Sequence, residues 1–405
     1  MNILYIHQYF ATPLGTTGTR SYEFARRWVR SGHSVQVLTT TAQLTADDLR
    51  NAKGRFFKRF LIEGIDVLAV SIPYRQQMGI LKRCMVFTAF VTAAVWLVIS
   101  LGKYDIIYAT STPLTVGIPA LFAKWLRRKK FVFEVRDQWP QIPIEMGIIR
   151  NKILIKVLLW LEKVIYKNAA AIVALSPGMA QGIQNVLGNL CKKQIAVIPN
   201  SCDTDRFSPD IDGTALRREK NWADKFILLH TGAMGKANGL GFVVNVSGKL
   251  KNQRDILFVL VGEGNEKQTI VEMIKKDDLT NIEILQPMAK SELPKIMAAA
   301  DVSIVIFANY PILEHNSANK FFDSLSAGKP VLLNYSGWQR ELLEAGGAGL
   351  GCELCNMDEF IEKVLFLSRN AGILKQMGAK ARQLAMTDFN RDNHATTALK
   401  LLETV

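Results

Sequence analysis

Short apolar runs alternate with longer amphipathic stretches along the whole chain. The longer stretches repeat apolar residues at the period of an α-helix. This alternation is typical of a parallel β-sheet covered by helices, so we predict an α/β fold. The predicted strands are Ile3–His7, Ser34–Thr39, Asp66–Ser71, Asp105–Ala109, Phe131–Val135, Ala171–Ala174, Gln194–Ile198, Phe226–His230, Ile256–Val261, Ile282–Leu285, Val302–Ile306 and Val331–Asn334.

The alternation is interrupted near the middle of the chain. Pro199 to Asp224 is rich in turn-forming residues, and the strand–helix pattern restarts after it. A chain of 405 residues is also long for one ordinary domain. We therefore predict two Rossmann-like domains, 1–198 and 225–385, joined by a linker over 199–224. The helix expected in 386–405 is a candidate to return to the first domain.

The positive charge lies in the first half of the chain. The formal net charge is +14, and residues 1–200 hold 26 of the 50 Lys and Arg but only 10 of the 36 Asp and Glu. Such a field attracts an anionic membrane surface or nucleic acid. A basic surface that only aids solubility is the alternative.

The five cysteines give no sign of a metal or redox site. Cys352 and Cys355 have C-x-x-C spacing, but they lack a second pair and a nearby histidine. We predict no bound metal. Because the cysteines are few and odd in number, and the first residues already form a predicted strand, we expect a reducing cytosol and no secretory leader.

Cys84 to Leu101 is an uncharged stretch at the lower limit for crossing a bilayer. Hydroxyl side chains interrupt it, and a strand predicted for the first sheet follows at once. We therefore favour a helix that covers the sheet or lies in the membrane interface over a helix that spans the membrane.

Two turns in the first half are candidate sites, because ligands bind at the carboxyl ends of strands in open parallel sheets. After the first strand, Gly15 and Gly18 allow close approach of a ligand, and Arg20 can pair with an anion. After the strand Phe131–Val135, the turn carries Arg136 and Asp137. We expect these two to orient a substrate; a purely structural ion pair is the alternative.

Two turns in the second half are suited to phosphate. Gly232, Gly235 and Lys236 lie where a glycine-rich turn is expected to open a helix, whose amide groups favour anions. The turn with Gly262 and Gly264 leaves the next strand and is expected to line the same site. By itself this turn is not a complete dinucleotide fingerprint.

The fourth turn is the most specific. Ser317 is placed to cap a helix that stops at Gly328. Lys320 and Asp323, three residues apart, are expected to share the face beside the helix start. There the lysine can meet phosphate while the carboxylate accepts hydrogen bonds from ribose hydroxyls. A solvated surface ion pair is the alternative.

At these residues the chain resembles the family-four glycosyltransferases of the GT-B fold, over nearly its whole length. The matching segments are GTTGTRSYEFARRWVRSGHSVQVLT, EVRDQWP, AIVALSPGM, VIPNSCDTDRF, VGEG and SANKFFDSLSAGKPV. The resemblance implies two Rossmann-like domains with parallel sheets facing across a cleft, a nucleoside-diphosphate sugar as donor, retention of configuration and no metal. The most similar members are bacterial O-antigen and capsule transferases, including those proposed to move N-acetylfucosamine.

The resemblance also implies roles for single residues. Asp323 takes the place of the second acid of the family's paired-glutamate motif, and Gly18 approaches the donor phosphates. The chain departs from the family at His315, where the first acid is expected and Glu314 is one position away. It departs again at two positions where many relatives carry an arginine and a lysine for the diphosphate. Ala233 and Asn238 stand there, so we expect Lys236 and Lys320 to supply the charge.

Together the turns and the resemblance predict three sets of site residues. They are catalytic Asp137, Arg136 and Lys320; donor-binding Gly18, Gly232, Gly235, Lys236, Gly262, Gly264, Asn319 and Asp323; and acceptor-binding His7, Arg20 and Asp137.

The predicted function is a retaining, metal-independent glycosyltransferase of hexosyl or N-acetylhexosaminyl type. We expect it to move a sugar from a nucleotide sugar, UDP-linked rather than GDP-linked, to a lipid-linked saccharide in surface polysaccharide synthesis. The basic first domain, with Cys84–Leu101 and Ile153–Tyr166, would rest on the inner face of the cell membrane. The alternatives are a GT-B sugar-nucleotide epimerase and a basic nucleic-acid-binding protein. An NAD-dependent oxidoreductase fits least, because the glycine fingerprint is incomplete.

Overall fold

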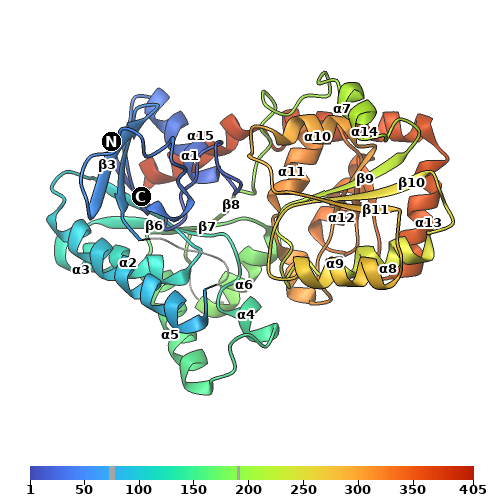
Figure 1. The fold of residues 1–405 in the computed structure, drawn as a ribbon. Helices are drawn as coiled ribbons and strands as arrows, with labels where there is room; N and C mark the ends of the chain where they lie inside the picture. Colours follow the sequence, from blue (N-terminus) through green and yellow to red (C-terminus); the bar gives the residue numbers. More distant parts are fainter. Residues whose placement is uncertain (73–77, 189–191) are drawn as a thin grey trace. The chain divides into compact units, whose positions relative to one another are not determined.

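The structure is a computed structural model that describes residues 1–72, 78–188 and 192–405. It divides into two units. The first comprises Met1–Pro199 together with Asp392–Val405, and the second comprises Asn200–Arg391. Each unit is a β-sheet with helices on both faces (Figure 1). Cys191, one of the five cysteines considered above, lies outside the described residues.

The first sheet has eight strands in the order β3-β4-β2-β1-β5-β6-β7-β8. Neighbouring strands are parallel except β3 and β4, which pair antiparallel. The strands are β1 (Asn2–Ile6), β2 (Ser34–Thr40), β3 (Phe57–Ile62), β4 (Ile65–Val70), β5 (Ile106–Thr110), β6 (Lys130–Val135), β7 (Ala171–Ala174) and β8 (Ile195–Val197).

Two hydrophobic cores cover the two faces of this sheet. Side chains of α2, α3, α5 and α6 form one core, and side chains of α1 and α15 form the other. Figure 1 accordingly shows α2, α3 and α5 below the sheet and α1 and α15 above it. The helices are α1 (Arg20–Arg30), α2 (Ile80–Ser100), α3 (Gly117–Arg127), α4 (Gln141–Glu145), α5 (Lys152–Asn168), α6 (Pro177–Leu187) and α15 (Arg391–Thr404).

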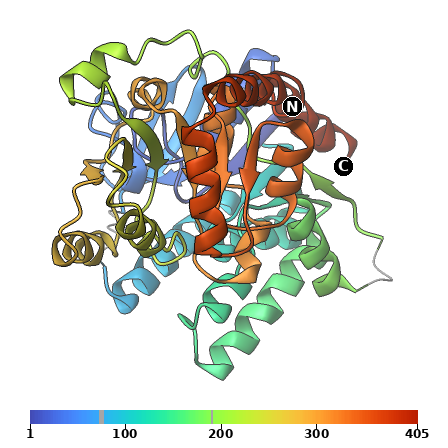
Figure 2. The same ribbon diagram turned by 90° about the vertical axis from the view of Figure 1, so that its right-hand side faces the viewer.

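The second sheet has six parallel strands in the order β11-β10-β9-β12-β13-β14. Figure 2, in which this unit faces the viewer, shows helices on either side of the strands. The strands are β9 (Phe226–Thr231), β10 (Ile256–Val261), β11 (Ile282–Leu285), β12 (Val302–Val305), β13 (Val331–Leu333) and β14 (Gly349–Gly351). The helices are α7 (Thr214–Glu219), α8 (Gly241–Lys249), α9 (Lys267–Lys276), α10 (Leu293–Ala299), α11 (Asn319–Ser326), α12 (Trp338–Gly346), α13 (Met357–Ser368) and α14 (Ala371–Thr387).

Two α/β units, whose sheets are parallel except for the β3–β4 pair, confirm the predicted fold class. The sequence pattern missed β3 and β14. β3 is an edge strand that leaves its Leu61 exposed, so it has no clean apolar run. β14 contains two glycines, and at Gly349 a Cβ atom would lie 2.1 Å from the Val331 carbonyl oxygen. Close pairing with β13 therefore explains why this strand lacks an apolar signature.

The uncharged stretch Cys84–Leu101 forms most of α2. Its residues Phe90, Ala94, Leu97 and Val98 are buried in the core beneath the first sheet. Their spacing places them on one side of the helix, so α2 covers the sheet as expected. Among the described residues, no helix is both long and apolar enough to cross a membrane.

The stretch 199–224, expected to be a linker, belongs to the second unit almost entirely. Its Phe207 and Trp222 are buried in the core on one face of the second sheet. The turn-forming residues around them hid this packing from the sequence pattern. At the other end of the chain, α15 packs on the first unit, where the Trp28 indole N–H donates to the Ala395 carbonyl oxygen at 2.9 Å.

Candidate functional site

A polar cluster in the first unit forms where β1 and β6 end. His7 follows β1, and its Nδ1 lies 2.7 Å from Ser21 Oγ at the start of α1. Its Nε2 lies 3.3 Å from Nη1 of Arg136, which follows β6. Burial, aided by the Arg136 guanidinium, holds the pKa of His7 well below its usual range. The imidazole is therefore neutral, with Nε2 accepting from Arg136 and Nδ1–H donating to Ser21.

Asp137 is anchored beside this cluster. Thr112 Oγ1 donates to Asp137 Oδ2 at 2.7 Å, and the Arg136 backbone N–H donates to Ser111 Oγ at 3.0 Å. Ser111 and Thr112 follow β5, the strand between β1 and β6. Arg136 and Asp137 thus have different partners and are both part-exposed. In place of the structural ion pair that was the alternative, the Arg136 guanidinium contacts His7 and the Asp137 carboxylate contacts Thr112.

Arg20, expected to bind the acceptor, is already fully engaged. Its Nε donates to Glu134 at 2.9 Å, and its two other nitrogens donate to the carbonyl oxygens of Pro199 and Ile198. Glu134 is buried and also accepts from Tyr108 and Thr110. Burial alone would raise the pKa of Glu134, but the Arg20 and Arg136 guanidiniums hold it below its usual range. We therefore correct the prediction: Arg20 fixes the start of α1 in place.

In the second unit, Lys320 is the centre of the candidate site. Its Nζ donates to His230 Nε2 at 3.0 Å and to Asn238 Oδ1 at 3.1 Å. Burial lowers the pKa of Lys320 to about 7. Burial, together with the Lys320 cation, lowers the pKa of His230 well below its usual value. The lysine thus sits against a neutral imidazole, and an ammonium group with two such partners can donate one further hydrogen bond.

The glycine turns after β9 and β10 pack against each other beside Lys320. Met234 N–H donates to the Glu263 carbonyl oxygen at 2.8 Å. A Cβ atom at Gly262 would lie 1.8 Å from the Gly232 carbonyl oxygen, and one at Gly264 would lie 2.3 Å from that of Met234. Gly232 and Gly262 also have positive φ. Glycine is therefore required at these turns for close backbone packing.

Lys236 does not lie at a helix start, contrary to the prediction. Residues 232–240 form an irregular loop, and α8 begins only at Gly241. Gly235 is within this loop, and the Lys236 side chain is exposed. The proposed pairing of Lys236 with a helix dipole is therefore wrong in its local structure, although the exposed ammonium remains free to approach a ligand.

α11 supplies the helix start beside Lys320. Asn319 and Lys320 are its first two residues, and Gly328 follows its end with positive φ, as predicted. The prediction that Ser317 caps this helix is wrong, because α11 has no side-chain cap. The Ser317 hydroxyl instead accepts from the Asn200 backbone N–H at 3.1 Å. The first amide groups of α11 lack a side-chain cap, which leaves them to solvent or to an anion.

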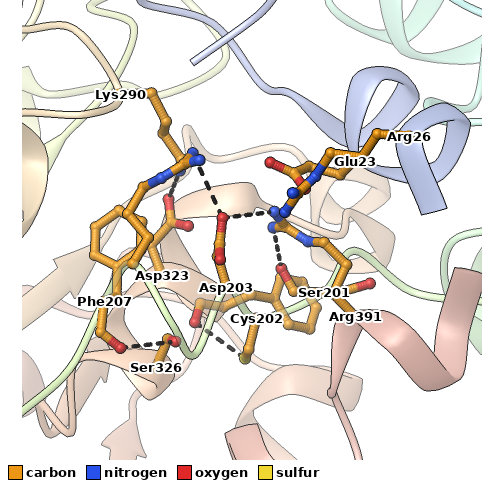
Figure 3. Close-up of polar contacts among 12 residues, drawn as sticks. Glu23, Arg26, Ser201, Cys202, Asp203, Phe207, Lys290, Asp323, Ser326 and Arg391 are labelled. Atoms are coloured by element: carbon orange, nitrogen blue, oxygen red, sulfur yellow. Dashed lines mark hydrogen bonds and ion pairs between the residues drawn. The ribbon is translucent and has the colours of Figure 1, made fainter. Parts of the chain in front are cut away.

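Asp323 pairs with Lys290. Both side chains of this ion pair are buried, and the Lys290 ammonium also lies over the Phe207 ring (Figure 3). Lys320 and Asp323 therefore have separate protein partners, and their expected approach to one ligand stays a prediction. Next to them, Arg391 donates to Asp203 Oδ2 at 3.1 Å and to the Ser201 carbonyl oxygen at 2.7 Å. Residues 201–203 are thereby fixed within the second unit.

The sequence pattern did not single out His230 or Lys290. His230 is the second-last residue of β9 and looks like an ordinary polar residue near a strand end. Lys290 lies in an irregular loop between β11 and α10, where one lysine among many carries no signal. Gly18 lies in the loop before α1 and is part-exposed.

Two parallel-sheet units with polar clusters at the carboxyl ends of their strands define a protein of the GT-B class. Family models match both halves: the glycosyl transferase 4-like domain over residues 15–201, and glycosyl transferases group 1 over residues 212–384. The chain therefore belongs to the family-four glycosyltransferases of the GT-B fold.

Relatives of known name are distant and are matched in part. The chain is 23% identical over 204 residues to a candidate colanic acid biosynthesis glycosyl transferase, WcaI, of Escherichia coli, covering 50% of this chain and 49% of the relative. It is 21% identical over 201 residues to N-acetyl-alpha-D-glucosaminyl L-malate synthase of Bacillus anthracis, covering 49% and 51%. The chain thus matches about half the length of these relatives.

Solved structures match over the whole chain. Sucrose-phosphate synthase of Thermosynechococcus elongatus superimposes with a TM-score of 0.77 at 16% identity, covering 100% of this chain and 98% of that chain. HepE of Anabaena, in complex with UDP-glucose, superimposes with a TM-score of 0.72 at 19% identity, covering 100% of both. At these identities the likeness establishes the GT-B fold.

Proposed function

We propose that the protein transfers a sugar, with retention of configuration and without a metal, from a UDP-sugar to a lipid-linked saccharide. The observation that carries the proposal is the Lys320 ammonium. It lies beside the uncapped start of α11 and against the glycine turn at Gly232, where a Cβ atom would be 3.2 Å from its Nζ. A cation and free amide groups converging at the ends of parallel strands suit a diphosphate.

The second unit would hold the donor. Lys320 would stabilise the charge that develops on the leaving diphosphate, together with the first amide groups of α11 around Asn319. Asn238, where many relatives carry a cation, already accepts a hydrogen bond from Lys320. Lys320 therefore brings a cation next to Asn238, the position at which many relatives carry one. Lys236, exposed on the same loop, would add a second cation.

Asp323 remains the proposed ribose ligand, although its carboxylate is paired with Lys290. The glycine turns at Gly232, Gly262 and Gly264 would keep the backbone low enough for the nucleotide to approach. The structure of HepE is a complex with UDP-glucose, and this supports a UDP-sugar as the donor of this chain as well.

The first unit would hold the acceptor. Asp137 is placed to accept a hydrogen bond from an acceptor hydroxyl, and Arg136 is placed to contact an anionic group, with His7 steadying the guanidinium. A membrane-associated, lipid-linked acceptor agrees with the positive charge of this half. The E. coli relative WcaI is described as a colanic acid biosynthesis glycosyl transferase, and this supports a role in surface polysaccharide synthesis.

Among the described residues, no three His, Cys, Asp or Glu side chains gather closely enough to hold a metal ion. Metal independence nevertheless stays a prediction of the family resemblance. It requires that lysine and backbone amide groups neutralise the leaving diphosphate. Activity that is unchanged by a strong chelator would agree with it.

Calorimetry with UDP, GDP and a panel of their sugars tests the donor. We expect UDP and one UDP-sugar to bind more tightly than the GDP series, and NMR of the transfer product to show the donor's anomeric configuration. An inverted product would contradict the retaining mechanism. Conversion of the UDP-sugar to its epimer without any acceptor would identify the epimerase alternative instead.

A further inference from the structure

α5 carries an apolar stripe on its outer side. Ile153, Val157 and Trp160 are 75%, 51% and 64% exposed, and they recur at intervals of four and three residues. This spacing places them in one line along the helix. Large exposed apolar side chains in such a line are unusual for a surface that only meets water.

A stripe of lysines runs beside the apolar one. Lys152, Lys156, Lys163 and Lys167 are all exposed and are also spaced at whole turns of the helix. The single acid of α5, Glu162, is buried on the opposite side, where it accepts from Gln141 Nε2 at 2.8 Å. The outer side of α5 is thus apolar and cationic, without a negative charge. We call these seven residues, Ile153, Val157, Trp160 and the four lysines, the α5 outer face.

The outer face is not needed to hold α5 on its sheet. Ile165 and Tyr166, on the other side of the helix, are buried in the core of the first unit, and Leu161 packs against that core. The Asn151 side chain caps the helix by accepting from the backbone N–H groups of Ile153 and Leu154. Helix start and packing are therefore complete without the outer residues. Figure 1 shows α5 with α2 and α3 on the side of the sheet opposite α1 and α15.

We propose that the α5 outer face docks the protein on an anionic lipid surface, with the apolar stripe entering the interface and the lysines contacting lipid headgroups. An apolar stripe flanked by lysines is the pattern of helices that lie in the membrane interface. A second copy of the chain fits less well, because pairing two such faces would bring the lysine stripes together. This inference rests on the proposed function and deepens it, because it names the surface by which the protein would reach a lipid-linked acceptor.

α2 does not carry the docking, although its sequence is more apolar. Its residues Phe90, Ala94, Leu97 and Val98 are used in packing against the sheet. The outer part of α2 between Thr88 and Ser100 carries no charged side chain to contact a headgroup. The combination of exposed apolar and cationic stripes therefore singles out α5.

The test is binding of the full chain to vesicles, measured by co-sedimentation. We expect binding to vesicles containing phosphatidylglycerol and weak binding to pure phosphatidylcholine. The V157E/W160E double variant should lower the affinity at least about tenfold. Lys156→Gln and Lys163→Gln should each lower it about fivefold at low salt, and added salt should shrink that effect.

Matched controls lie in the second unit. Phe366 and Met386 are 43% and 49% exposed, so the F366E/M386E variant repeats the apolar-to-acidic change elsewhere, and Lys275→Gln repeats the loss of an exposed lysine. Both controls should bind vesicles like the parent protein. Equal binding of V157E/W160E and the parent would overturn the proposal, as would parent dimers that dissociate in V157E/W160E without any effect on vesicle binding.

UDP affinity, measured on the same variants, separates this inference from the proposed function. The α5 variants should keep the parent's UDP affinity, because they change only exposed side chains of the first unit. A parent protein that binds anionic vesicles but no nucleotide would leave the docking face in place and refute the donor assignment.

Discussion

Lys320 is a lysine whose surroundings favour its neutral form. Burial lowers its pKa to about 7, and its two polar partners, His230 and Asn238, are uncharged groups that do not repay the lost hydration. A diphosphate at this position would supply the missing negative charge. The bound ligand must then raise the pKa of Lys320, so ligand binding and protonation are linked.

The first residue-scale prediction follows from this linkage. Binding of UDP-glucose at pH 8 should take up close to one proton, and the affinity should fall by up to about tenfold per pH unit above 7. Calorimetry in buffers of different ionisation enthalpy measures the uptake. UDP-glucose is the right probe because its diphosphate has no proton to exchange in this range.

Lys320→Met should remove both the proton uptake and the pH slope, and weaken binding by about 2 kcal/mol, as expected for one charge-assisted hydrogen bond. Lys236→Met, on the exposed loop, is the matched control and should keep the proton uptake. Uptake that persists in the Lys320 variant would show that another group meets the diphosphate.

The candidate site residues could be predicted from the sequence better than their contact partners could. Lys320 was singled out because a lysine stands beside a helix start, a local feature of the sequence. Its partners His230 and Asn238 are 90 and 82 residues away, so only the fold brings them together. Arg20 was misassigned for the same reason, because its partner Glu134 is 114 residues distant. Asp323 likewise turned out to face Lys290.

At the scale of elements, the turns after β9 and β10 act as one interlocked pair. Gly262 has a φ of +155°. The carbonyl oxygen of Gly232 occupies the space that a Cβ atom would need. Gly232 in turn lies against Lys320, so a change in the packing of these two turns should reach the nucleotide site.

Gly262→Ala should therefore destabilise the second unit by about 1–3 kcal/mol and weaken UDP binding at temperatures where the unit is still folded. Gly372→Ala, in α14 of the same unit, is the control, because a Cβ atom there meets nothing within 4 Å. Denaturant unfolding and calorimetry give the two numbers. An unchanged UDP affinity in folded Gly262→Ala would mean that the turns do not shape the site.

Elements with a strong apolar period were predicted well and those without one were missed. Ala171–Ala174, Ile256–Val261 and Ile282–Leu285 were predicted with the bounds that the structure gives. The first two of these strands, β7 and β10, are fully buried and consist of continuous apolar runs, whereas β11 is an edge strand that keeps only a partial apolar run. β3 and β14 escaped because one is an exposed edge and the other consists largely of glycine. Whether a stretch such as α2 packs or meets lipid depends on its neighbours, which periodicity alone does not specify.

At the scale of the whole molecule, the last residues of the chain belong to the same unit as the first. The first unit is built from residues at both ends of the sequence, because α15 buries Ala395, Ala398 and Leu402 in the core that β1 also lines. The second unit contributes nothing to this core. The stability of the first unit should therefore depend on the last residues of the chain, and that of the second should not.

Ala398→Asp puts a charge into a fully buried position of that core without a partner, which should cost the first unit more than about 3 kcal/mol. Hydrogen exchange followed by mass spectrometry can report each unit separately. Peptides from β1 and β2 should lose protection, while peptides from β9 and β10 keep it.

Thr396→Asp, two residues away on the exposed side of α15, is the control and should leave both units protected. Equal loss in both sheets would mean that the two units unfold as one, and unchanged protection of β1 would mean that α15 is dispensable. Because the proposed nucleotide site lies within the second unit, the Ala398→Asp variant should still bind UDP-glucose as its first unit loosens.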